Sequence, residues 1–244
     1  MTRLSVNLNK IALLRNARGG DLPNVMAFAR RCIEHGAEGL TIHPRPDERH
    51  ITRRDVYDLA ELVPTDDCEY NIEGYPSEEF LRMVEEVRPT QCTLVPDAPD
   101  QLTSDHGWDA IGRGDLLRDV VERLHAAGIR TSLFIDPDPA QLDAAKATGT
   151  DRVELYTGPY AEAVATDREQ AVKPYAIAGH HAADIDLGLN AGHDLNLDNL
   201  SFFVRHVPTV LEVSIGQAFV RDCLYDGLEN TIGYYLRALD KPAR

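Results

Sequence analysis

Two histidines and two glutamates lie at or near the ends of four separate segments rich in valine, isoleucine and leucine. The four residues are His43, Glu73, Glu154 and His193. Imidazole and carboxyl groups whose pKa values are separated by their surroundings supply a general base and a general acid near neutral pH. Any one of these residues alone is more often an ordinary polar side chain. Four in equivalent positions indicate a site for proton transfer.

Glycine turns follow the last two apolar segments, in the strings "NAGHD" and "SIGQAF". Gly192 and Gly216 would let backbone N–H groups approach an anion, and the second turn opens the last helical region, where a helix N-terminus favours phosphate. Arg18 and Arg45 would add positive charge nearby. The spacing alone is equally consistent with ordinary turn glycines and solvated arginines, but the combination favours a phosphate site.

The elements that must position these residues are strands and helices in strict alternation. Several helical patterns stop at a glycine, namely Gly36, Gly128 and Gly149, and Pro23 and Ser77 suit helix starts. Alternation predicts parallel strands covered by helices, and eight such units fit one (β/α)₈ barrel domain over residues 1–244. An open doubly wound sheet is the alternative, although no G-x-G-x-x-G string follows the first strand. The predicted strands are 4–9, 39–44, 69–75, 91–97, 130–138, 152–158, 187–194 and 210–217.

Polar and apolar residues alternate within the predicted strands, as in "LSVNLN" at the start of the chain. In a barrel, one set faces the helices and the other points inward. We therefore expect the barrel interior to be polar and open to solvent at the carboxyl ends of the strands, and its lower layers to be filled by apolar side chains. Three connections after strands, 10–22, 98–114 and 159–170, exceed the length of a bare loop and predict extra structure on the catalytic face.

The composition indicates a soluble intracellular enzyme rather than a nucleic-acid or membrane protein. The formal net charge of −15 repels nucleic acid and anionic lipid. The first residues contain no apolar signal core, and no segment approaches the length of a membrane span. The four cysteines are too widely spaced for a zinc motif, so we expect reduced thiols and a cytoplasmic location.

A metal site is a less favoured interpretation of the same acidic and imidazole groups than metal-free acid–base catalysis. Glu154, His193 and Glu212 are possible ligands of a divalent ion. The sequence lacks an HxH pair on the first strand, an HExxH string and an acidic cluster. We therefore predict a site without metal.

The same residues stand in strings that resemble the pyridoxine 5′-phosphate synthase family, and the resemblance covers essentially the whole chain. The two longest and most specific strings contain "LRNARGG" and "GLTIHPRPDERHIT". The others are "YNIEGYPSEE", "CTLVPD", "SLFIDPD", "ELYTGPYA", "LNAGHDLN" and "SIGQA".

The resemblance implies a (β/α)₈ barrel with extra helices in the βα loops, commonly assembled as a homo-octamer. It also implies an enzyme of vitamin B6 biosynthesis that uses neither metal nor organic cofactor. The substrates would be 3-amino-2-oxopropyl phosphate and 1-deoxy-D-xylulose 5-phosphate, and the products pyridoxine 5′-phosphate, phosphate and water. Two phosphorylated substrates would account for local basic residues in an acidic chain.

Roles follow from the matching positions. His43 and Glu73 resemble the proton acceptors, His193 the proton donor, and Glu154 the residue that stabilises the transition state. The positions that resemble contacts to the aminoketone phosphate or the product are Asn7, Arg18, Gly216 and Gln217. Those that resemble contacts to the deoxyxylulose phosphate are Asn9, Lys10, Arg45, His50 and Thr103. Gly192 and Asp194, in the turn after the seventh strand, complete the predicted substrate-binding set.

Several positions depart from the pattern that is common in the family. Asn9-Lys10 replaces Asp-His, Tyr156 and Gln217 each replace His, and Asp194 replaces Gly. Gln217 can donate a hydrogen bond but cannot carry a positive charge, whereas Lys10 can restore a positive charge near a phosphate.

Two other functions remain open. One is a metal-dependent sugar-phosphate isomerase or aldolase on the same barrel, and the other is a non-catalytic barrel that binds a phosphorylated ligand.

Overall fold

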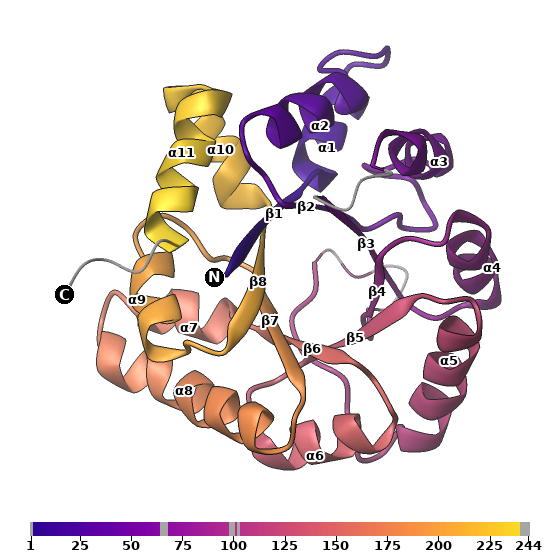
Figure 1. Ribbon diagram of the computed structural model, residues 1–244. Coiled ribbons are helices and arrows are strands. Elements are labelled where there is room, and N and C mark those ends of the chain that lie inside the picture. Colours follow the sequence, from indigo (N-terminus) through magenta and orange to yellow (C-terminus); the bar gives the residue numbers. More distant parts are fainter. Residues whose placement is uncertain (1, 64–67, 98–100, 102, 240–244) are drawn as a thin grey trace.

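The computed structural model describes residues 2–63, 68–97, 101 and 103–239. Eight parallel strands pair in chain order and close where β1 meets β8, which confirms the predicted barrel and excludes the open sheet. The strands form a central ring with the helices outside it (Figure 1). The strands are β1 (Arg3–Asn7), β2 (Gly39–Ile42), β3 (Glu69–Gly74), β4 (Gln91–Leu94), β5 (Arg130–Ile135), β6 (Arg152–Tyr156), β7 (Gly188–Gly192) and β8 (Val210–Ile215).

The helices include extra ones beyond a single helix per strand, as predicted. Two of them, α1 and α7, occupy the long connections 10–22 and 159–170, and both α10 and α11 follow β8. Residues 98–100 and 102 of the third long connection lie outside the described residues. The helices are α1 (Asn9–Asn16), α2 (Val25–Glu34), α3 (Arg53–Leu62), α4 (Glu78–Val87), α5 (Gly114–Ala126), α6 (Pro139–Ala147), α7 (Gly158–Ala163), α8 (Arg168–Asp184), α9 (Leu200–His206), α10 (Gln217–Asp226) and α11 (Leu228–Leu239).

Local signals in the sequence set most of these boundaries. Ser77 is the N-cap of α4, where its hydroxyl accepts a hydrogen bond from the Phe80 N–H at 3.2 Å. The predicted start at Pro23 is displaced, because Asn24 caps α2 and Pro23 lies one residue before the cap. The predicted stop glycines Gly36, Gly128 and Gly149 all have positive φ.

The interior of the barrel differs from the prediction, because its lower layers are polar rather than apolar. Ser5 and Thr41 share a hydrogen bond of 2.7 Å, and the Thr93 hydroxyl donates to Asn71 at 3.0 Å. At the amino ends of the strands, Glu69 forms salt bridges with three arginines, Arg3, Arg130 and Arg152. The apolar side chains of the strands instead pack against the helices, so the hydrophobic core is a ring outside the barrel. Hydrogen bonds and ion pairs replace apolar packing on the inside.

Within the described residues, no helix is both long enough and apolar enough to cross a membrane.

Candidate active site

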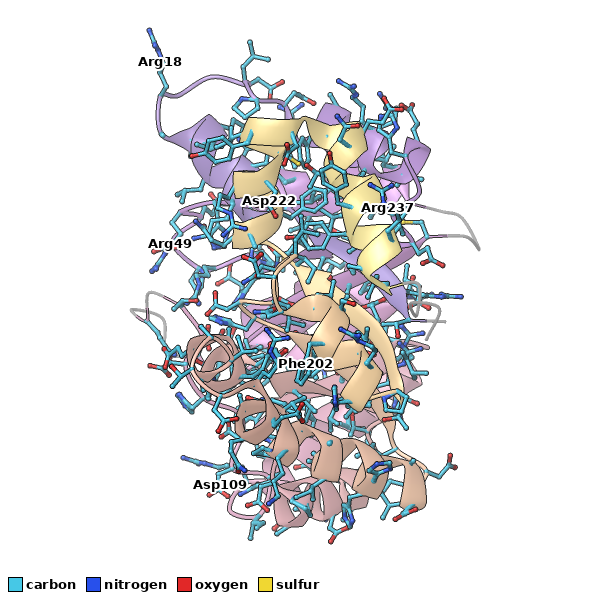
Figure 2. All side chains as sticks on the ribbon, turned by 90° about the vertical axis from the view of Figure 1, so that its left-hand side faces the viewer. Arg18, Arg49, Asp109, Phe202, Asp222 and Arg237 are labelled. Carbon is cyan, nitrogen blue, oxygen red and sulfur yellow. The ribbon has the colours of Figure 1, made fainter. Side chains whose placement is uncertain are left out.

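A pocket of about 470 Å³ opens at the carboxyl ends of the strands. Arg49 and Asp109, which follow β2 and β4, lie along the same side of the molecule in Figure 2. Apart from Arg18 and Gly192, every site residue predicted from the sequence lines the pocket. They are Asn7, Asn9, Lys10, His43, Arg45, His50, Glu73, Thr103, Glu154, His193, Asp194, Gly216 and Gln217. The sequence did not single out Arg49, Phe134 and Ser214, which also line it.

The two histidines contributed by the loop after β2 are buried and neutral. Burial, followed by the charge of Arg45, holds the pKa of His43 well below its usual value. The same two causes lower the pKa of His50 to about 4. The Nδ1 atom of His50 accepts a hydrogen bond from the Ile51 N–H at 2.9 Å, which fixes its tautomer. A neutral imidazole in this position can accept a proton.

The two carboxyl groups have the opposite shift. Burial raises the pKa of Glu73 well above its usual value, and the neighbouring Glu154 and Asp97 raise it further. Burial and the charge of Glu212 raise the pKa of Glu154 to about 8. These shifts favour the protonated form of both groups, and Glu154, with a pKa of about 8, is protonated at neutral pH and can donate a hydrogen bond. The Asn7 amide approaches Glu73 Oε2 at 3.5 Å.

Gly192 does not line the pocket but leaves space for the side chain of Glu154, which does. A Cβ atom at Gly192 would lie 2.2 Å from Glu154 Oε1. The glycine therefore makes room for the carboxyl group on the neighbouring strand β6, with which β7 pairs at Tyr156 and Gly192. Sequence analysis had assigned this glycine to an anion site.

Positive charge gathers at the mouth of the pocket although the chain is acidic. Lys10, Arg45 and Arg49 line it, and α10 begins there with Gly216 as its N-cap. The first N–H groups of a helix have no partner within the helix and attract anions. A Cβ atom at Gly216 would lie 3.2 Å from the Asn7 side chain, so the turn approaches β1 closely.

Asp97 is a site residue that sequence reasoning missed. It is buried, and its Oδ2 atom accepts hydrogen bonds from Arg45 at 2.5 Å and Ser104 at 2.8 Å. The Arg45 guanidinium also donates to the Gln101 carbonyl at 2.9 Å. These contacts fix the guanidinium at the wall of the pocket, which the string "LVPD" alone did not predict.

Arg18 lies away from the pocket. It is exposed, and Figure 2 shows its side chain pointing outward from the edge of the molecule. Its neighbours Arg15 and Asn16 have a structural role instead. Arg15 forms a buried salt bridge with Asp55 at 2.5 Å and donates to the His50 carbonyl at 3.1 Å. Asn16 donates to the same carbonyl at 2.7 Å, so α1 fixes the loop that carries His50.

Among the described residues, no group of three or more histidine, cysteine, aspartate or glutamate side chains is arranged to hold a metal ion. Glu154, His193 and Glu212, the set considered from the sequence, therefore do not form such a group.

The sequence model of the family described as "Pyridoxal phosphate biosynthesis protein PdxJ" matches residues 4–241. The chain belongs to this family. It is 58% identical over 235 residues to the pyridoxine 5′-phosphate synthase of Porphyromonas gingivalis, covering 96% of this chain and 98% of the relative. It is 54% identical over 239 residues to the synthase of the same name from Bacteroides thetaiotaomicron, and the match covers 98% of this chain and 100% of that relative. The resemblance found in the sequence is confirmed.

Solved structures of other proteins share the fold. The 3-keto-L-gulonate-6-phosphate decarboxylase of Vibrio cholerae has a TM-score of 0.69 at 9% identity and covers 100% of this chain and 99% of its own. A thiamine phosphate pyrophosphorylase from Pyrococcus furiosus has a TM-score of 0.63 at 11% identity, with coverages of 98% and 96%. At these identities the likeness extends to the barrel alone.

Proposed function

We propose that this pocket condenses 3-amino-2-oxopropyl phosphate with 1-deoxy-D-xylulose 5-phosphate to give pyridoxine 5′-phosphate, phosphate and water. The observation that carries the proposal is the meeting of His43, Glu73, Glu154 and His193 around one pocket in a chain of the synthase family. An amine must attack a ketone, water and phosphate must leave, and an enamine carbon must close the ring. Each step moves a proton, which requires several groups with separated pKa values.

His43 and Glu73 are the proposed proton acceptors. His43 is neutral across the physiological range because its pKa is lowered by burial and by Arg45. Burial raises the pKa of Glu73 well above its usual value, which favours the protonated form. A bound substrate amine is cationic before it loses a proton, and an adjacent cation favours the carboxylate form. Glu73 thus becomes an acceptor when the aminoketone binds.

Glu154 and His193 are the proposed donors to developing negative charge. The protonated carboxyl group of Glu154 can donate a hydrogen bond in a site where few waters compete. The imidazolium form of His193 can protonate a departing oxygen. The Nε2 atom of His193 lies 3.0 Å from the Thr103 hydroxyl, on the wall of the pocket.

The two phosphate groups would bind at different edges of the pocket. Gly216 and Gln217 at the start of α10 suit one phosphate through backbone N–H groups. Arg45, His50 and Lys10, which also line the pocket, suit the other. The pocket would then hold both substrates at once, as a condensation requires.

Assembly and location are inferred chiefly from the family resemblance. We infer a homo-octamer of single-domain subunits in the cytoplasm, and exposed apolar side chains support self-association. Leu22, Leu224 and Tyr225 are 80%, 72% and 83% exposed. Light scattering on the purified protein tests the octamer, and a monomer at micromolar concentration would contradict it.

The decisive experiment measures phosphate release and product fluorescence with both substrates, with each one alone and with neither. We expect phosphate and fluorescent product only when both substrates are present. His43→Asn and Glu73→Gln should each lower the rate by about 10²- to 10⁴-fold, the usual contribution of a general acid or base. Glu122→Gln, a change of an exposed residue on α5, serves as the control. Enzyme-dependent phosphate release from one substrate alone would overturn the proposed reaction. The absence of phosphate release from the mixture of both substrates would overturn it as well.

A further inference from the structure

The turn that carries His193 is fixed through three consecutive backbone carbonyl groups. The Thr157 hydroxyl contacts the carbonyls of Gly192 at 2.7 Å and His193 at 2.5 Å. The Asp194 carbonyl accepts hydrogen bonds from the side-chain amides of Asn196 and Asn199, each at 3.2 Å. The backbone of this turn is therefore held from β6 on one side and from the start of α9 on the other.

This turn has an unusual backbone conformation at two adjacent residues. His193 has a φ of 85° and Asp194 a φ of 60°, both in the left-handed region. Side chains other than glycine are uncommon there, although aspartate and histidine are among those that tolerate it. Such conformations persist where surrounding contacts impose them, and they concentrate at functional sites.

One consequence of the turn is that the two side chains meet. His193 Nδ1 lies 3.0 Å from Asp194 Oδ2. An ionised carboxylate is an acceptor only, so Nδ1 must carry the hydrogen and Nε2 is left for the pocket. The ring is also held by Thr103 at Nε2, at 3.0 Å, and by the ring of Tyr156, whose centroid lies 5.1 Å away.

We propose that Asp194 is a positioning residue that holds the His193 ring through Nδ1 and fixes its tautomer, so that Nε2 faces the pocket and delivers the proton. The sequence reading had placed Asp194 among the substrate contacts, where a carboxylate would repel a phosphate. As the partner of Nδ1, the same carboxylate assists catalysis without touching substrate. This inference rests on the proposed function, because it assigns the group that prepares the proposed proton donor.

Charges around the pair are consistent with an ionised Asp194. The hydrogen bond from His193 lowers the pKa of Asp194, and the charge of Lys10 on α1 lowers it further, while burial opposes both. The other titratable groups facing this cluster are Tyr156 on β6 and, around Tyr156, Asp105, Asp136 and Glu162 from neighbouring loops and α7.

The test compares Asp194→Asn with Asp198→Asn, an exposed aspartate a few residues further along the chain. Asparagine tolerates the left-handed backbone, so the turn is retained. Its neutral amide is a weaker hydrogen-bond partner for Nδ1 than a carboxylate, and we expect kcat to fall by about tenfold or more with KM within about threefold, since charge-assisted hydrogen bonds are the stronger ones. Asp198→Asn should change neither quantity.

Each outcome separates this inference from the proposed function. If wild-type protein releases phosphate but Asp194→Asn keeps the wild-type kcat, the role of Asp194 is overturned while the function stands. If KM rises with kcat unchanged, Asp194 is a substrate contact and the inference is again overturned. If wild-type protein shows no turnover, the proposed function fails. In that case the pH dependence of pyridoxine 5′-phosphate binding tests the pair directly, and an identical profile in wild type and Asp194→Asn overturns it. Circular dichroism and the thermal midpoint confirm that each variant is folded.

Discussion

Replacing Glu154 by glutamine should make the protein more stable and less active. Glu154 is buried and forms no salt bridge with any described residue. Its pKa in the folded protein is about 8, compared with 4.5 when unperturbed, because of burial and the charge of Glu212. At neutral pH, folding therefore requires Glu154 to take up a proton. Glutamine has nearly the same shape and needs no proton.

The sign and size of the effect follow from linkage. A carboxyl group whose pKa is raised on folding costs nothing below its unfolded pKa, and the cost grows as pH rises toward the folded pKa. One pKa unit corresponds to about 1.4 kcal/mol, so the cost at pH 7 is about 3 kcal/mol. Glu154→Gln removes this cost. The free energy of unfolding of the variant, relative to wild type, should therefore increase by about 3 kcal/mol between pH 4.5 and pH 7.

Urea denaturation followed by circular dichroism at several pH values between 4.5 and 8 measures this difference. Glu122→Gln on the exposed face of α5 is the matched control and should show no pH-dependent gain. The same Glu154→Gln protein should lose most of its phosphate-release activity, a stability–activity trade-off typical of buried catalytic groups. A variant whose relative stability stays constant or falls across this range would refute the assignment of a protonated Glu154.

Three further changes test other parts of the structure. Gly192→Ala should displace the Glu154 carboxyl and reduce activity by about tenfold or more in the phosphate-release assay, as misplacing a catalytic group does. Gly114→Ala, where a Cβ atom would meet nothing within 4 Å, should be silent, and equal activities would contradict the fit at Gly192. Arg15→Met leaves Asp55 buried without its partner and should lower the free energy of unfolding by about 3–5 kcal/mol in urea, whereas a loss below about 1 kcal/mol would show that the pair is dispensable. Added salt should raise KM for both phosphorylated substrates, because screening weakens their attraction to the basic mouth of the pocket, and salt-independent KM values would argue against that attraction.

The fold was largely predictable because the signals for it are local. Strand–helix alternation and the stop glycines each involve a few neighbouring residues, and together they predict a closed barrel. The site was predictable for a related reason, since parallel strands bring their carboxyl ends to one edge. Inward-pointing residues near the carboxyl ends of the strands, such as His43 and Glu154, therefore face the same mouth.

The arginine contacts that sequence reasoning missed join residues far apart in the chain. Arg15 pairs with Asp55, 40 positions away, and Arg45 pairs with Asp97, 52 positions away. No local pattern distinguishes such an arginine from a solvated one. Arg18 shows a different limit, because the string around it is specific to the family while its own side chain points outward from this chain. A string can thus identify the family without locating each of its residues.

The polar interior of the barrel explains how the site obtains carboxyl groups with such different states. Glu69, at the amino ends of the strands, would have a raised pKa through burial, but hydrogen bonding and charge from Arg130, Arg152 and Arg3 lower it, so it is ionised. Its charge, together with burial, raises the pKa of Glu212 to about 7, and Glu212 in turn raises that of Glu154. Each carboxylate thus raises the pKa of the next carboxyl group inside the barrel, from Glu69 to Glu212 and from Glu212 to Glu154. An apolar interior would bury Glu154 equally well but would contain no charge beneath it. We therefore interpret the hydrophilic lower layers as part of the arrangement that keeps Glu154 protonated, as the proposed reaction requires.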